Sequence, residues 1–178
     1  YNDVTEERST LAEQVNPGGI NFVHHQKPKR ETPKLRNARQ LTELIRKDPR
    51  VMGVAPTLSS QVFYNYGPVQ LNGTVAGVDI LEEDKLFDLR SKMKSGRLED
   101  LQANADGIIM GTGLARKLNV KTGDRVVITT PEGYTMTLKI VGTFQMGIGL
   151  VDNIRSYANI STVQVILQQD QSYITDIN

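Results

Sequence analysis

The sequence predicts an α/β (α+β) fold in which strand and helix segments at both ends of the chain flank a strand-rich middle. Apolar residues recur at helical spacing between residues 35 and 45 and again around residue 163. Between these helices, alternating apolar and polar residues form pairs of segments separated by glycine and proline turns, which is typical of β-hairpins. This order indicates an α/β unit that carries a β-rich insertion.

The first elements are expected within residues 1–50. Residues 1–14 are polar and compatible with a helix, and they should form a stalk or a frayed arm. A turn signal then begins a short strand at Ile20–His25. Thr32 as N-cap and Pro33 in the first turn predict a helix that ends at Asp48-Pro49.

A β-hairpin and a helix are expected next. The strands of the hairpin are Val51–Tyr66 and Val69–Asp79, and Gly67-Pro68 separates them. Asp79 also begins a capping-box pattern, in which its side chain would cap a helix and an acid three residues later would cap in return. That helix should continue to Gly96, where glycine is a common stop.

The turn Gly111-Thr112-Gly113 is the most conspicuous motif in the chain. It follows a short apolar strand, Gly107–Gly111, and begins an amphipathic helix for which Thr112 can serve as the N-cap. A dinucleotide-binding turn would have a third glycine where this chain has Arg116. No Lys-Ser or Lys-Thr pair follows a glycine, as a P-loop would require. We therefore interpret the turn as one that shapes the chain, in preference to one that binds phosphate.

A second hairpin is predicted after the turn at Gly123-Asp124. Its strands are Arg125–Thr130 and Tyr134–Phe144. The second strand alternates with a period of two, which should place its apolar residues and one glycine on one face. These residues are Tyr134, Met136, Leu138, Ile140, Gly142 and Phe144.

Composition excludes several functions. Lysine and arginine together number 21 and aspartate and glutamate 20, so no net field would draw the chain onto nucleic acid. Cysteine is absent, and the two histidines, His24 and His25, are adjacent and would point to opposite faces of a strand. No nucleophile with a base and no isolated pair of acids stands out. We therefore predict no catalytic residue, no cofactor and no metal site.

Three stretches of the sequence carry a family resemblance. They are, in this order, "GVDILEEDKLFDLRSKMKSGRL", "IIMGTGLARKLNVKTGDRVVIT" and "LKIVGTFQMGIGLVDNIRSYANISTVQVIL". Together they resemble the MacB-like periplasmic core domain of ABC-transporter permeases, of the lipoprotein-releasing LolC/LolE type, from about Ile20 to Asn178. The order and spacing of the three stretches carry the resemblance.

The resemblance implies a porter-like strand-helix-strand part that is interrupted by a β-rich, sabre-like part. Residues 1–14 would be a stalk that continues a membrane helix, residues 15–60 and 154–178 the porter-like part, truncated at its C-terminus, and residues 61–153 the sabre-like part. No apolar run approaches the ~18 residues of a membrane span. We expect a piece of a longer protein, namely the periplasmic domain of a bacterial inner-membrane protein.

A function follows from the same resemblance. The domain would be non-catalytic and would couple cytoplasmic ATP hydrolysis to the release or export of lipoproteins or other envelope substrates. Its partners would be a cytoplasmic ABC ATPase subunit, reached through the membrane part of the protein, a second permease subunit and, as a further candidate, a periplasmic lipoprotein carrier. One alternative is an FtsX-like protein-interaction domain that regulates envelope enzymes. Another is a small-molecule-binding domain in which Thr112, Asp124 and the two glycines of the turn line a polar pocket at a helix N-terminus.

The expected docking site is a polar loop after the last predicted helix. A capping box of Ser161 and Gln164 would fix the start of that helix, and Val163, Ile166 and Leu167 would anchor it. In LolC-type subunits the matching loop contains a proline, precedes an arginine and docks the lipoprotein chaperone, whereas this loop has no proline and Asn178 stands at the arginine position. The loop should contact a paired permease subunit or a periplasmic carrier, the alternative being a surface loop with no partner. Its residues are Gln168, Gln169, Asp170, Gln171, Ser172 and Tyr173.

Overall fold

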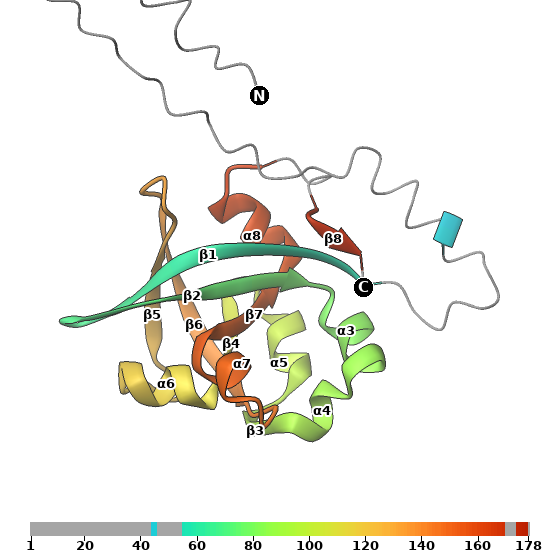
Figure 1. The fold of residues 1–178 in the computed structure, drawn as a ribbon, viewed down its shortest axis with the longest axis horizontal. Helices are drawn as coiled ribbons and strands as arrows, with labels where there is room; N and C mark the ends of the chain where they lie inside the picture. Colours follow the sequence, from blue (N-terminus) through green and yellow to red (C-terminus); the bar gives the residue numbers. More distant parts are fainter. Residues whose placement is uncertain (1–43, 46–54, 170–173, 178) are drawn as a thin grey trace, which may run out of the picture. The chain divides into compact units, whose positions relative to one another are not determined.

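A computed structural model describes residues 44–45, 55–169 and 174–177 of the 178-residue chain (Figure 1). These residues belong to one compact unit, Thr32–Asn178. The predicted stalk at 1–14 and the predicted strand Ile20–His25 lie outside the described residues. Of the helix predicted to begin at Thr32, only residues 44 and 45 are described, and both are helical.

The strands form one mixed sheet that closes into a ring. Antiparallel pairs join β1 to β2, β7 to β4, β6 to β5 and β5 to β1, and parallel pairs join β2 to β7 and β4 to β6. The ring therefore runs β1-β2-β7-β4-β6-β5 and returns to β1. Its strands are β1 (Pro56–Tyr66), β2 (Val69–Val78), β4 (Gly107–Gly111), β5 (Arg125–Thr129), β6 (Thr135–Phe144) and β7 (Arg155–Asn159).

Two short strands extend the ring. β3 (Met93–Gly96) pairs with the end of β6, and β8 (Asp176–Ile177) pairs with the start of β1. Strands from both the predicted porter-like and sabre-like parts thus belong to the same sheet, and the domain division remains a prediction. The mixed helix and strand content confirms the predicted α/β (α+β) class, and both predicted hairpins, β1–β2 and β5–β6, are present.

The first core cluster fills the ring. Residues Phe63–Asn65 of β1 pair with β2 on one side and with β5 on the other, which closes the sheet. Tyr64, at the centre of this segment, is fully buried in the first core cluster. Two helices contribute apolar residues to the same cluster, α6 (Thr112–Leu118) and α8 (Ile160–Ile166), which Figure 1 shows on opposite sides of the strands. The strand and helix residues of this cluster are Leu58, Val62, Tyr64, Val75, Ile108, Met110, Leu114, Ala115, Leu118, Val126, Ile128, Leu138, Ile140, Ala158, Val163 and Ile166.

The second core cluster lies on the other side of β2, β7, β4 and β6. Three short helices contribute to it, α3 (Ile80–Phe87), α4 (Leu89–Lys92) and α5 (Leu98–Ala103). The residues that these helices bury include Ile80, Leu89, Leu98 and Leu101, which meet Phe144 and Tyr157 from the sheet. The rings of Phe144 and Tyr157 lie 5.1 Å apart in a tilted arrangement, a favourable geometry for aromatic pairs.

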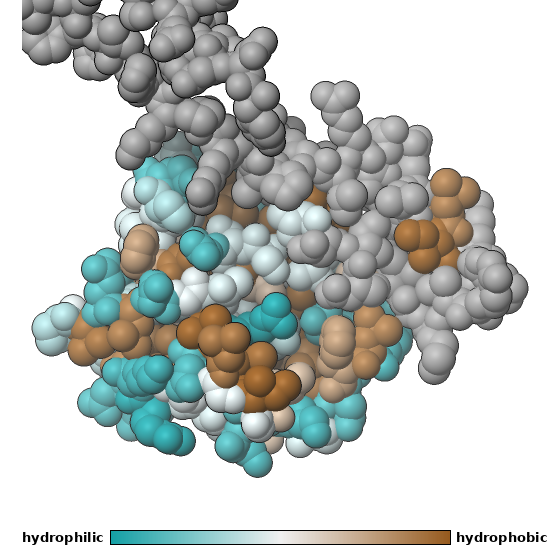
Figure 2. Space-filling model, in the orientation of Figure 1, coloured by the Kyte–Doolittle hydropathy of each residue, from teal (hydrophilic) through white to brown (hydrophobic). Residues whose placement is uncertain are grey.

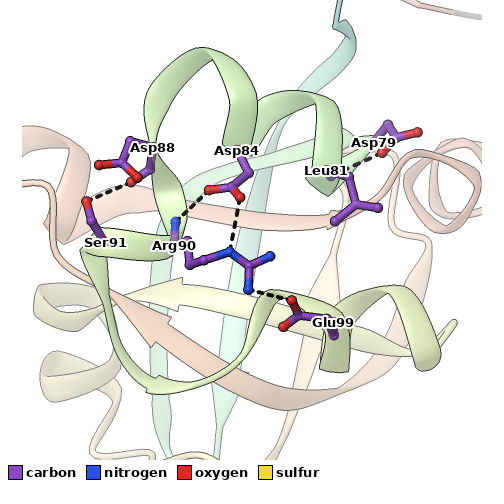
Figure 3. Close-up of polar contacts among 7 residues, drawn as sticks. All are labelled: Asp79, Leu81, Asp84, Asp88, Arg90, Ser91 and Glu99. Carbon is purple, nitrogen blue, oxygen red and sulfur yellow. Dashed lines mark hydrogen bonds and ion pairs between the residues drawn. The ribbon is translucent and has the colours of Figure 1, made fainter.

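The single helix predicted from Asp79 to Gly96 is wrong in its length. Asp79 caps α3 as predicted, because its carboxylate accepts the backbone N–H groups of Leu81 and Glu82. The helix then stops at Asp88, whose φ of 49° is left-handed, and α4 continues in a new direction. Figure 3 shows the reason: the carboxylate of Asp84 accepts the N–H of Arg90 at 2.7 Å and so satisfies a donor in the first turn of α4.

The predicted apolar face of β6 is also wrong in its second half. Leu138 and Ile140 lie in the first core cluster, whereas Phe144 lies in the second. The pairing with β4 passes from Ile108↔Ile140 to Ile109↔Gly142, so Val141 is an additional residue. Such a bulge reverses which side chains face which side, because strand side chains alternate with a period of two.

Two predicted helix caps do not form. Thr112 is the first residue of α6, the N-cap is Gly111, and no side chain caps it. In α8 the N-cap is Asn159, so Ser161 lies inside the helix and the capping box with Gln164 is wrong. The Asn159 amide instead donates to the carbonyl oxygens of Leu101 and Asn104, which joins α8 to α5 at the cost of the cap.

Candidate functional site

The Gly111-Thr112-Gly113 turn lies against α7 (Gly149–Ile154). A Cβ atom at Gly111 would lie 2.8 Å from the carbonyl carbon of Asp152, and one at Gly113 would lie 2.9 Å from the Asp152 carbonyl oxygen. Both distances are shorter than real Cβ contacts. The two glycines thus let the backbone of β4 and α6 approach that of α7, which agrees with the interpretation of the turn as one that shapes the chain.

Asp152, which this turn contacts, holds the loop that precedes α7. Its two carboxylate oxygens accept the N–H groups of Met146 at 2.7 Å and Gly147 at 3.0 Å. Its own N–H donates to the carbonyl oxygen of Ile148 at 2.9 Å. The Asp152 side chain is only 7% exposed, and hydrogen bonds to a shielded carboxylate are stronger than those between neutral groups.

The end of this loop and the first turn of α7 expose two apolar side chains. Ile148 is 59% exposed and Leu150 is 71% exposed. In Figure 2, apolar residues gather on the surface in the region of α7. We call residues 146–150, which comprise the end of this loop and the first two residues of α7, the apolar loop. Exposed apolar patches that are surrounded by polar residues often mark protein–protein contact sites. Here the backbone beneath the patch is also fixed by hydrogen bonds.

A buried charged group lies on the opposite side of β7 from the first core cluster. Glu83 of α3 is only 3% exposed, and its Oε2 atom has no hydrogen-bond partner in the part of the chain that the structure describes. Burial raises the pKa of Glu83 above its ordinary value of 4.5, and the positive charge of Arg155 opposes this rise. The guanidinium of Arg155 lies 5.9 Å from the centre of the Tyr157 ring, so these groups form one electrostatic cluster.

The predicted docking loop is described only at its start. Gln168 and Gln169 are exposed directly after α8, and Asp170, Gln171, Ser172 and Tyr173 lie outside the described residues. The N–H of Gln169 donates to the Gln164 carbonyl oxygen at 2.9 Å, which ends the helix with a defined geometry. Docking by this loop remains a prediction.

The residues proposed for a small-molecule pocket are not brought together. Thr112 lines an open depression with Arg116 and Lys121, but Asp124 and the glycines of the turn do not line it. Asp124 serves the following turn instead, where its carboxylate accepts the N–H of Lys121 at 2.9 Å. Within the described ranges, no group of three or more His, Cys, Asp or Glu side chains is placed to hold a metal ion.

Comparison with known proteins identifies the family to which the chain belongs. The model of the MacB-like periplasmic core domain matches residues 4–177. The chain belongs to this family. Domains of this family are in general non-catalytic parts of transporter permeases, and the chain is a periplasmic domain of an ABC-transporter permease, an inner-membrane protein.

Curated relatives of this MacB-like domain include lipoprotein-releasing system proteins. LolC of Xylella fastidiosa is 30% identical over 135 residues, which cover 69% of this chain and 32% of the relative. LolC of Neisseria meningitidis serogroup B is 29% identical over 131 residues, which cover 68% of this chain and 31% of the relative. The chain thus spans about a third of the length of these relatives, and the predicted LolC/LolE type is confirmed.

Solved structures show the same fold for the MacB-like domain. The periplasmic region of MacB from Actinobacillus actinomycetemcomitans has a TM-score of 0.57 at 15% identity, with 89% of this chain and 69% of that chain covered. The extracellular domain of the ABC-type transporter YknZ from Gram-positive bacteria also has a TM-score of 0.57, at 12% identity, with 81% and 71% covered. No helix in the described part of the chain is long and apolar enough to cross a membrane.

Sequence reasoning missed the apolar loop. The stretch Gly147-Ile148-Gly149-Leu150 places each of two large apolar residues next to a glycine, shortly after the predicted hairpin, and this was the available signal. The role of Asp152 could not be predicted from the sequence, because the path of the loop places the backbone N–H groups that donate to its carboxylate.

Proposed function

We propose that this MacB-like domain is a non-catalytic part of a permease subunit that couples cytoplasmic ATP hydrolysis to the release or export of lipoproteins or other envelope substrates. The names of the LolC relatives support this assignment of substrates. The cytoplasmic ABC ATPase would act through the membrane part of the protein, and a second permease subunit would complete the transporter.

The observation that carries the proposal is the rigid apolar loop. A domain that transmits motion needs a contact that does not yield when it is displaced. Ile148 and Leu150 have such a support, because the Asp152 carboxylate fixes their loop and α7 packs directly on the turn of Gly111 and Gly113. A displacement of the β4–α6 backbone would thus displace the apolar loop by a similar amount.

The occupant that we propose for the apolar loop is the periplasmic domain of the paired permease subunit. A backbone that is already held by hydrogen bonds loses little conformational entropy on binding, which lowers the cost of forming the contact. The predicted loop of Gln168–Tyr173 would serve a second contact, with the paired subunit or a periplasmic carrier.

Photo-crosslinking in the intact transporter tests this proposal. Crosslinkers replace Ile148, Leu150 and, as a control, Phe87, an apolar residue of α3 that is 44% exposed. We expect Ile148 and Leu150 to capture the paired permease subunit in a manner that changes with the ATPase cycle, and Phe87 to capture less. Capture of an envelope hydrolase would instead favour the FtsX-like alternative, and equal capture at all three positions would remove the special role of the apolar loop.

A transport measurement complements the crosslinks. In the intact permease, Ile148→Ser with Leu150→Ser should lower substrate release at an unchanged amount of transporter in the membrane, because both side chains are exposed and their loss removes a contact and not a core. Phe87→Ser, which also replaces an exposed apolar side chain by serine, is the control and should leave release unchanged. Full release in the double variant would contradict the proposal.

A further inference from the structure

We propose that the open depression between α6 and β3 binds a tetrahedral oxyanion, such as a phosphate group on an envelope molecule. It has a volume of about 390 Å³, enough for a phosphate group together with part of the molecule that carries it. Its polar lining comes from helix α6, the turn after it and the adjacent ends of β3 and β6. The lining residues used here are Ser95, Thr112, Arg116, Lys121, Thr122 and Thr143.

Two cations at the depression have no counter-ion among the described residues. Arg116 and Lys121 are exposed, and neither forms an ion pair with another residue that the structure describes. Two other described arginines, Arg90 and Arg125, do form ion pairs, and Arg125 lies 3.5 Å from the Asp106 carboxylate. Asp124, an acid in the turn after α6, does not line the depression, and its carboxylate accepts the backbone N–H of Lys121. An oxyanion between the two cations would therefore gain a favourable field.

Three hydroxyl groups provide the hydrogen-bond donors. The Oγ atom of Ser95 lies 2.6 Å from Oγ1 of Thr122 and 2.8 Å from Oγ1 of Thr143. Each hydroxyl carries one hydrogen, so the cluster has more hydrogens than its two internal bonds consume, and at least one O–H remains to donate to a ligand. The Thr112 hydroxyl, which makes no hydrogen bond with any described residue, adds another donor.

The position of Ser95 is fixed by the backbone. β3 pairs with the end of β6, with Ser95 opposite Thr143 and Gly96 opposite Gly142. Gly96 has a φ of 68°, and a Cβ atom there would lie 2.8 Å from the Gly142 Cα, so the two strands approach more closely than other residues would allow. The hydroxyl cluster thus rests on a rigid base. The site uses these side chains and not the backbone of the Gly-Thr-Gly turn.

A titration of the ¹⁵N-labelled 178-residue chain with inorganic phosphate tests the site, at constant ionic strength set by chloride. We expect saturable shifts of the amide signals of Ser95, Thr112, Thr122 and Thr143. The double variant Arg116→Gln with Lys121→Gln should bind phosphate roughly tenfold or more weakly. Lys117→Gln removes the same kind of charge from an exposed neighbour outside the depression and should leave the affinity unchanged.

A second arm distinguishes free from lipid-borne phosphate. Cosedimentation uses phosphatidylcholine vesicles with and without phosphatidic acid. Binding of phosphate in solution, lost in the double variant, supports the site with the free ion as ligand. Binding only to phosphatidic acid vesicles, again lost in the double variant, supports it with a phosphate on a larger molecule. No binding in either arm, or equal weakening by Lys117→Gln, overturns the proposal.

The hydroxyl cluster has its own variant. Thr143→Val keeps the shape of a half-buried side chain but removes one hydroxyl from the cluster, so phosphate binding should weaken severalfold while the thermal unfolding midpoint stays close to that of the parent chain. Unchanged phosphate affinity in a folded Thr143→Val chain would contradict a role for the hydroxyls.

Discussion

Gly111 lies so close to Asp152 that a Cβ atom at position 111 would be 2.8 Å from the Asp152 carbonyl carbon. This contact joins the most conspicuous sequence motif to the residue that holds the apolar loop. The Gly-Thr-Gly turn therefore supports α7, and through α7 it supports the exposed side chains of Ile148 and Leu150.

The first prediction concerns the glycines of the turn. Gly111→Ala should lower the free energy of unfolding by about 1–3 kcal/mol, because the new methyl group would meet backbone atoms that cannot rotate away. Gly113→Ala should cost less, since its nearest contact is the side-chain oxygen of Asn153, which can move. Chemical denaturation measures both changes.

Gly149→Ala is the matched control for these variants. A Cβ atom at Gly149 would meet only the Asn153 side-chain nitrogen, at 3.8 Å, an ordinary van der Waals distance. Alanine is also favoured over glycine in a helix, and Gly149 begins α7. Gly149→Ala should thus be neutral or slightly stabilising, and a loss equal to that of Gly111→Ala would show that close approach is not the cause.

The second prediction concerns the hold on the apolar loop. Asp152→Asn replaces one acceptor oxygen by an NH₂ group, which would face the N–H of Met146 or Gly147. We expect a loss of about 1–3 kcal/mol of stability and faster hydrogen exchange at residues 146 and 147. Glu132→Gln, on an exposed turn, removes the same charge and should change neither.

Elements with local signals were predictable from the sequence. The hairpin of β5 and β6 has strict alternation around a proline and glycine turn, and the strand Gly107–Gly111 is a short apolar run, buried along its whole length. The fold class and the family followed from such segments and their order. In each case the residues that specify the element are neighbours in the chain.

Features that depend on strand register or on particular side-chain hydrogen bonds were not predictable. The bulge at Val141 follows from the register between β6 and β4, and neither strand shows it alone. The helix break at Asp88 depends on a bond between the Asp84 side chain and the N–H of Arg90. The hold of Asp152 on the apolar loop was missed because its bonds to the N–H groups of Met146 and Gly147 depend on the path of the loop.

The third prediction concerns a buried hydrogen bond inside the ring. The hydroxyl of Tyr64 lies 2.6 Å from that of Ser156, and both residues are wholly buried. Tyr64→Phe and Ser156→Ala should each cost about 1–3 kcal/mol, because each leaves one buried hydroxyl without its partner. The double variant should cost less than the sum of the two, and thermal or chemical unfolding of all four chains measures the coupling. Strict additivity would show that the two hydroxyls do not depend on each other.

The last prediction is a pH dependence that originates in Glu83. Because burial raises the pKa of Glu83 in the folded state above 4.5, the folded chain binds the proton more tightly than the unfolded chain. Stability contributed by this group is therefore present at low pH and is lost as the pH rises from about the unfolded value through the raised folded pKa. Arg155 limits the loss, since its charge favours the ionised form.

Glu83→Gln keeps the shape of the side chain and cannot ionise, so this variant should be more stable than the parent near neutral pH and should lose that advantage towards pH 4. Denaturant unfolding at a series of pH values measures the difference, with Glu132→Gln as the control for the loss of one exposed carboxylate. A Glu83→Gln chain that is less stable than the parent at neutral pH would mean that attraction to Arg155 outweighs the cost of burial.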